Sequence, residues 1–185
     1  MQLSRETIIK AALDLLDTYG LADTTMRRVA GSLGVAPGAL YWHITNKQDL
    51  ISALADAILA PLSGTSPVEL SLSLRSTLLA HRDGAEVVSA ALSQPHSLAW
   101  EQLVARFKSA LAAAGHGADD ATRQLGAESV LHLVLGATTL EQSLLQYQAA
   151  TGNTAAEERA GEHSGADKLA RAVHIVLAGT DSLDR

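Results

Sequence analysis

Apolar residues recur at intervals of three and four along most of this 185-residue chain, and that spacing lines one face of an α-helix. The first such segment carries Ile8, Ala11, Ala12, Leu15, Leu16 and Tyr19. Aromatic residues, which favour strands, make up only 3% of the sequence. The pattern therefore predicts an all-α protein.

Helix start and stop signals divide this periodic pattern into segments. Ser4 and Asn46 are good N-cap residues, and Gly20 and Gly34 are typical of the position just after a helix. The expected helices cover residues 4–19, 25–33, 37–43, 46–61, 67–80, 85–92, 96–114, 119–150 and 167–179. Residues 62–67, rich in Ser, Gly and Pro, are expected to form a link.

The two short predicted helices on either side of Gly34 have the proportions of a helix-turn-helix. In that motif the second helix presents its N-terminal residues to base edges in the major groove of DNA. Here the second helix begins with Pro37, Gly38 and Ala39, which have no long hydrogen-bonding side chain. Recognition of bases must therefore depend largely on residues outside these three.

Candidate DNA contacts surround the motif. Arg27 could reach a guanine through two hydrogen bonds, and Ala39 could touch a thymine methyl group. Lys47 lies at the expected N-terminus of the fourth helix, where its charge and free backbone N–H groups suit a phosphate. The candidates for phosphate or sugar contacts are Tyr41, Trp42 and His43.

The charge balance is compatible with this hypothesis. The formal net charge is −6, but the first 50 residues carry as many basic as acidic side chains. A chain that is acidic overall can bind DNA if its cations gather on one face, because phosphate contacts are local. Two candidates have alternatives: Arg28 could be a solvated charge, and Trp42 could mainly pack inside the domain.

Features that the sequence lacks disfavour other classes of protein. Without Cys it has no disulfide scaffold or Cys-based zinc site, and its seven His show no metal-binding spacing. We therefore expect no metal and no cofactor. No nucleophile elbow or phosphate-binding loop supports an enzyme with an incidental DNA-binding module. No signal peptide or membrane-spanning run is evident, so we expect a cytoplasmic protein without membrane association.

Four runs in this region are separated from one another by only two residues each: residues 24–30 (TTMRRVA), 33–35 (LGV), 38–43 (GALYWH) and 46–50 (NKQDL). They resemble the N-terminal signature of the TetR family, and the resemblance extends over about residues 4–60. It implies a homodimer that binds a palindromic double-stranded DNA operator and is released by a small molecule. The residues at positions that contact DNA in the family are Arg27, Pro37, Gly38, Ala39, Tyr41, Trp42, His43 and Lys47.

The second half resembles the tetracycline-responsive branch of that family. Residues 81–85 (HRDGA) are similar to a turn of the branch, and residues 135–137 (LGA) with 140–142 (LEQ) to its dimer-forming helix. The resemblance implies two domains, a helix-turn-helix DNA-binding domain at 1–60 and a ligand-binding and dimerisation domain at 61–185. The long helix and the last helix of each subunit would form a four-helix dimer interface.

The metal–tetracycline ligands of the branch are largely missing. Val88 stands where the branch has a metal-binding His, and Ala91 stands at a nearby Thr position. Leu70 and Leu74 replace the expected polar anchors. The effector is therefore expected to be a small hydrophobic molecule rather than a magnesium–tetracycline complex.

Two polar positions of the branch do have counterparts. His132 matches directly, whereas Glu141 matches only with one residue inserted after Gly136. The predicted effector site is lined by Leu74, Leu78, His81, Val88, Trp100, Val104, Phe107, His132, Leu135 and Thr139.

The sequence thus predicts a ligand-responsive transcriptional repressor that is not an enzyme. A DNA-binding regulator without a small-molecule effector, acting as an activator or an architectural protein, stays open as the alternative.

Overall fold

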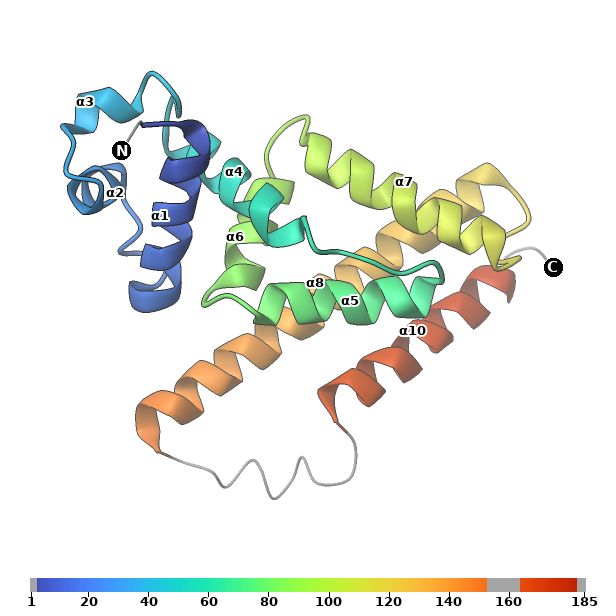
Figure 1. Ribbon diagram of the computed structural model, residues 1–185. Coiled ribbons are helices and arrows are strands. Elements are labelled where there is room, and N and C mark those ends of the chain that lie inside the picture. The colour runs from blue at the N-terminus through green and yellow to red at the C-terminus, as the bar shows by residue number, and fades with distance from the viewer. Residues whose placement is uncertain (1–2, 153–163, 183–185) are drawn as a thin grey trace. The chain divides into compact units, whose positions relative to one another are not determined.

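The computed structural model describes residues 3–152 and 164–182, in which all regular secondary structure is helical (Figure 1). The all-α prediction is thereby confirmed. The helices are α1 (Arg5–Tyr19), α2 (Met26–Ser32), α3 (Pro37–Leu40), α4 (Lys47–Leu59), α5 (Pro67–Leu79), α6 (Gly84–Leu92), α7 (Leu98–Ala113), α8 (Asp120–Thr151) and α10 (Gly165–Ser182).

The chain forms two compact units that are each built from separate stretches of sequence. The N-terminal unit contains Met1–Pro61 and Thr77–Ser97, and the C-terminal unit contains Leu62–Ser76 and Leu98–Arg185. The last residues of α5 and the whole of α6 therefore belong to the same unit as α1–α4.

The N-terminal unit is held together by apolar faces of its helices. Ile8, Ala12 and Leu16 give α1 a buried stripe at the expected spacing. Helix α4 packs along α6 and against α1. The fully or almost fully buried side chains of α4 and α6 include Leu50, Leu54, Ile58, Val87 and Val88.

The helix ends follow the local chemistry of the sequence. Ser4 caps α1 as predicted, because its hydroxyl accepts from Thr7 N (3.2 Å) while Ser4 N donates to Thr7 Oγ1 (2.9 Å). Asn46 caps α4 as predicted, accepting from Asp49 N at 2.8 Å. Gly20 ends α1 with a backbone angle φ of +87°, which an L side chain rarely adopts.

Two predicted helices are shorter in the structure than the sequence suggests. The prediction that the third helix reaches His43 is wrong, because the amides of His43 and Ile44 both donate to Leu40 O, at 2.9 and 2.8 Å, and close a turn there. The helix predicted from residue 96 begins only at Leu98, since His96 has a positive φ of 56°.

The C-terminal unit is organised around α8, the long helix that packs against α7 and α10 (Figure 1). One face of α8 is buried, and it includes Val130, Leu131 and Val134. Phe107 of α7 and Val173 of α10 are also fully buried. Across residues 3–152 and 164–182, every helix is too short or too polar to span a bilayer.

Candidate nucleic-acid interface and effector site

The helix-turn-helix of the N-terminal unit is formed by α2, α3 and a tight turn between them. Gly34 adopts the left-handed conformation (φ +67°), and its N–H donates to Gly31 O at 3.1 Å. The next amide, Val35 N, donates to Ala30 O at 3.0 Å. Leu40 is fully buried and anchors α3 on the rest of the unit. The motif therefore has the geometry that the sequence predicted.

Large aromatic side chains project from the end of α3. Trp42 is 89% exposed and Tyr41 is 52% exposed. A tryptophan at this exposure buries almost no surface, so the alternative that Trp42 mainly packs inside the domain is wrong. The start of α3 is open as well: Pro37 and Gly38 are exposed, and no atom lies within 4 Å of a Cβ built on Gly38. This surface could approach a double helix closely.

The two adjacent arginines of α2 are in different situations. The guanidinium of Arg28 forms an ion pair with Asp23 and lies 4.0 Å from the centre of the Tyr19 ring. Arg27 is exposed, and within the described part of the chain its side chain has no hydrogen bond or ion pair. Arg28 is therefore not simply a solvated charge, and Arg27 is the arginine available for a base or a phosphate.

An ion pair holds the turn after α3 against the start of α1. Arg5 donates through Nη1 to His43 O (2.7 Å) and through Nη2 to Asp49 Oδ1 (2.7 Å). Asp49 Oδ2 also accepts from Thr45 N at 2.8 Å. The hydrogen bond from Arg5 is the main reason that the pKa of Asp49 lies below its ordinary value and the pKa of Arg5 above it. The pair fixes the segment that bears Trp42 and leads to Lys47.

Sequence reasoning missed the role of Arg5. Its partner Asp49 lies 44 residues away, and nothing in their spacing marks the two as neighbours. Lys47 is exposed at the first position of α4, and His43 is half-buried.

The lowered pKa of Asp49 predicts a pH dependence of stability. A carboxylate whose pKa falls on folding stabilises the protein above its unfolded pKa of about 4, and this contribution is lost as the pH falls through the folded pKa. Asp49→Asn should therefore reduce the free energy of unfolding by about 1 kcal/mol at pH 7, and solvent screening of the pair keeps this value small. The reduction should become smaller as the pH falls. Denaturant unfolding at several pH values measures the difference.

The control for this prediction is Asp14→Asn, which removes an exposed carboxylate from the middle of α1 in the same unit. It should leave the free energy of unfolding nearly unchanged throughout. A constant difference between wild type and Asp49→Asn from pH 7 to pH 3 would contradict the prediction.

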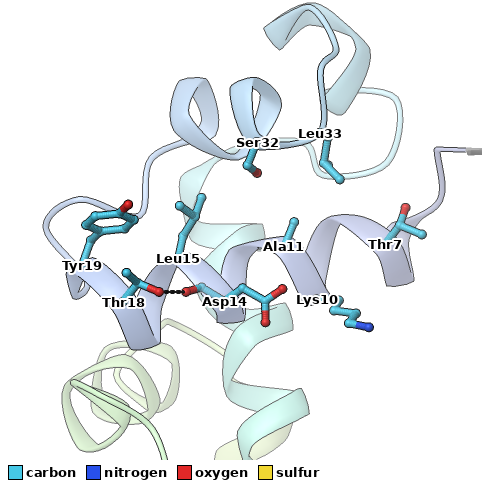
Figure 2. A pocket seen from close by; sticks show the side chains of 9 residues that line it. All are labelled: Thr7, Lys10, Ala11, Asp14, Leu15, Thr18, Tyr19, Ser32 and Leu33. Atoms are coloured by element: carbon cyan, nitrogen blue, oxygen red, sulfur yellow. Dashed lines mark hydrogen bonds between the residues drawn. The ribbon is translucent and has the colours of Figure 1, made fainter.

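An open cavity of about 510 Å³ lies on the N-terminal unit between α1 and the end of α2. Figure 2 shows Ala11 and Leu15 pointing from α1 toward Ser32 and Leu33. None of the residues predicted to contact DNA or the effector lines it; the lining residues are Thr7, Lys10, Ala11, Asp14, Leu15, Thr18, Tyr19, Ser32 and Leu33.

The residues predicted to contact the effector are divided between the two units. In the N-terminal unit, Leu78 and Val88 are fully buried, and His81 Nδ1 lies 3.1 Å from the Asp17 carboxylate. In the C-terminal unit, Leu74, Val104 and Phe107 are buried, and Leu135 and Thr139 are half-buried.

The C-terminal unit brings two of the predicted aromatic residues together. The rings of Trp100 on α7 and His132 on α8 are stacked, with centroids 5.3 Å apart and an interplanar angle of 30°. Trp100 is half-buried and His132 is exposed. The pair therefore offers a flat, partly accessible surface beside the buried face of α8.

Glu141, the expected counterpart of a tetracycline contact, is engaged elsewhere. Its carboxylate accepts from Arg75 Nε of α5 at 2.7 Å and also bonds Arg75 Nη2. The two side chains are only 19% (Arg75) and 27% (Glu141) exposed. Sequence reasoning did not identify Arg75 as its partner, because Arg75 lies 66 residues away in a Leu-rich helix.

Comparison with known proteins agrees with the geometry. Residues 8–54 match the family model described as "Bacterial regulatory proteins, tetR family". Tetracycline repressor protein class E of Escherichia coli is 37% identical over 158 residues, which span 80% of this chain and 72% of that protein.

Two solved structures extend the likeness to the whole chain. The crystal structure of BioQ with its natural double-stranded DNA operator superposes with a TM-score of 0.80 at 34% identity, covering 98% of this chain and 99% of that one. A variant of TetR from Acinetobacter baumannii AYE in complex with minocycline gives a TM-score of 0.76 at 27% identity, covering 100% and 99%. These relatives are regulators, which confirms that the protein is not an enzyme. The chain belongs to the TetR family of bacterial regulatory proteins and is a DNA-binding regulator of transcription.

Proposed function

We propose that this regulator is a repressor that binds a palindromic operator as a homodimer and leaves it when a small, mostly apolar effector binds. The observation that carries the proposal is the exposed surface of α2 and α3, where the side chains of Trp42 and Tyr41 and the start of α3 are all accessible to DNA. Arg27 and Lys47 supply exposed positive charge. The operator complex of BioQ, whose sequence and fold are similar, supports the same mode of binding.

The exposed face of α8 and α10 supports the homodimer. Leu140 of α8 and Ile175 of α10 are each 74% exposed. Further exposed apolar side chains of α8 are Leu125, Leu144, Leu145 and Tyr147. An apolar surface of this kind is unfavourable in water and is typical of a protein interface. Two copies that join these helices would form the four-helix interface that the sequence predicts.

The apolar and aromatic side chains of the C-terminal unit support an apolar effector. Leu74, Val104 and Phe107 provide buried apolar surface, and Trp100 with His132 provides an aromatic one. The related TetR variant is solved with minocycline, a small molecule. An effector that changes the separation of the two recognition helices from about 34–36 Å would release the operator. The protein would act in the cytoplasm, beside the bacterial chromosome.

The test of DNA binding compares the two arginines. An operator is first selected from random double-stranded DNA with the purified protein. Arg27→Ala should then weaken binding by about 10- to 100-fold, the range for loss of a bidentate base contact. Arg28→Ala should weaken it much less, because Asp23 and Tyr19 already hold that guanidinium. Fluorescence anisotropy at fixed salt measures both; equal losses, or wild-type binding that does not weaken with salt, would contradict the proposal.

The test of dimerisation places a charge on the exposed apolar face. Leu140→Glu and Ile175→Glu should convert the dimer to monomer, because each buries an unpaired carboxylate at the proposed interface. Leu98→Glu is the control, since Leu98 is 69% exposed but lies on α7. Sedimentation velocity gives the mass. A wild-type monomer, or variants that stay dimeric, would refute the α8–α10 interface.

A further inference from the structure

One buried hydroxyl of the C-terminal unit lacks a hydrogen-bond partner. The described residues include six buried polar side chains, namely Thr24, Ser71, Thr77, Thr138, Gln142 and Thr180. The hydroxyls of Thr24, Ser71 and Thr180 donate to carbonyl oxygens, and Thr77 and Gln142 also have partners. Thr138 is fully buried, and its Oγ1 bonds to nothing. Buried polar groups are nearly always paired, so this exception requires an explanation.

Neighbouring hydroxyls of α8 show that helix geometry does not cause the exception. Thr139 Oγ1 donates to Leu135 O at 2.8 Å, and Ser143 Oγ donates to Thr139 O at 2.9 Å. Thr138 does not form the equivalent bond to Val134 O. The other unpaired buried atom in the described part of the chain, Arg123 Nε, belongs to a guanidinium whose Nη2 bonds Ala118 O. Thr138 is therefore the clearest case of a polar group that lacks its counterpart.

The surroundings of Thr138 on α8 restrict the chemistry of that counterpart. Val134 lies one turn before it and is fully buried, and Gln142 lies one turn after it. Glu141, three residues away, is neutralised by Arg75. This part of the helix therefore offers one free hydroxyl between an apolar side chain and a partnered amide, with no unbalanced charge.

We propose that Thr138 is the hydrogen-bonding anchor of the effector, and that the effector is a neutral, mostly apolar molecule with a carbonyl-type acceptor oxygen. The inference rests on the proposed effector function and names the chemical class of that effector. A charged molecule would place an uncompensated charge in the apolar core, which is costly. The C-terminal unit also contains the stack of Trp100 on His132, an aromatic surface that suits an effector with an aromatic ring.

The first test needs no effector. Thr138→Val removes the unpaired hydroxyl at constant shape, so its melting temperature should rise by a few degrees. Thr180→Val is the matched control, because Thr180 is also buried in the C-terminal unit but donates to Val176 O at 3.0 Å. Its melting temperature should fall or stay the same. A fall for Thr138→Val would show that the hydroxyl is already satisfied, for example by water, and would overturn the proposal.

The second test uses two probes of the same shape. Acetophenone carries a carbonyl oxygen where α-methylstyrene carries a CH₂ group. Wild type and Thr180→Val should bind acetophenone about fivefold more tightly by calorimetry, the effect of one neutral hydrogen bond. Thr138→Val should bind the two probes equally. Equal binding by wild type, or no binding of either probe, would overturn the assignment.

The failure of this inference can be separated from the failure of the proposed function. Thr138→Val should bind the selected operator as tightly as wild type does, since the N-terminal unit is unchanged. If wild type shows the probe preference but never binds operator DNA, the proposed repressor function fails and the site stands. If wild type binds the operator but shows no probe preference, only the assignment of Thr138 fails.

Discussion

Gly84→Ala is expected to destabilise the N-terminal unit by about 3 kcal/mol, the upper end of the range for overpacking. A Cβ at this position would overlap with the backbone carbonyl oxygen of Leu78 and would lie 3.3 Å from the Cβ of His81. A backbone carbonyl at the end of α5 cannot move aside as the tip of a flexible side chain can. The melting temperature measured by circular dichroism should therefore fall by about 6–12 °C.

Gly31→Ala is the control for this prediction. Gly31 lies within α2, has ordinary helical geometry, and has no neighbouring atom within 4 Å of the position a Cβ would take. Alanine should therefore stabilise this helix by about 1 kcal/mol. Similar melting temperatures for Gly84→Ala and wild type would show that the α5–α6 turn is not packed as tightly as the structure has it.

Gly84→Ala should also weaken operator binding, because the turn before Gly84 supports α1. Asp83 Oδ2 accepts from Leu21 N at 2.7 Å, and Asp17 Oδ1 accepts from Arg82 N at 3.2 Å. These two carboxylates join the α5–α6 turn to the end of α1. A displaced turn would loosen the support on which the helix-turn-helix rests.

Arg75→Gln is expected to reduce the free energy of unfolding by about 2 kcal/mol, because it leaves the Glu141 carboxylate without its partner in a largely buried place. Glu141→Gln should cost less, since Arg75 can extend toward solvent. In the double variant the loss should be smaller than the sum of the two single losses, and this coupling measures the ion pair. Additive losses would show that the pair contributes nothing.

Gly165 provides an independent test of the same pair. A Cβ on Gly165, the first residue of α10, would overlap with Glu141 Oε1 and lie 2.9 Å from Arg75 Nη2. Gly165→Ala should push the tips of these two side chains aside and destabilise the protein only by what the displaced ion pair contributes, whereas Gly179→Ala, on the same helix with open space around it, should stabilise it. The start of α10 is therefore expected to depend on Arg75 and Glu141.

Local features of the structure were predictable from sequence, and long-range ones were not. The helical periodicity, the caps at Ser4 and Asn46 and the turn at Gly34 depend on residues a few positions apart, so the sequence contains what is needed. The ion pairs of Arg5 with Asp49 and of Arg75 with Glu141 depend on which helices meet, and the charge of an arginine does not specify its partner. The same limit explains why Arg28, next to Arg27 in sequence, was not recognised as the arginine held by Tyr19.

Thr138 shows this limit within the proposed effector site. Its neighbour Thr139 was among the residues predicted to line the site, but one residue on a helix changes the direction of a side chain by about 100°. Only the packing of α8 shows that Thr138 lies on the buried face and that the hydroxyl of Thr139 is already bonded.

The interrupted N-terminal unit affects how members of this family can exchange parts. Helix α4 packs along α6, yet the C-terminal unit supplies the chain between them. A hybrid protein joined once, near residue 61, would place α4 of one parent against α6 of the other. Transfer of operator specificity without loss of folding should instead need two junctions, so that residues 77–97 move together with the first 61. Recombination between relatives is therefore expected to preserve this pairing, and the residues of α6 should diverge in step with those of α4.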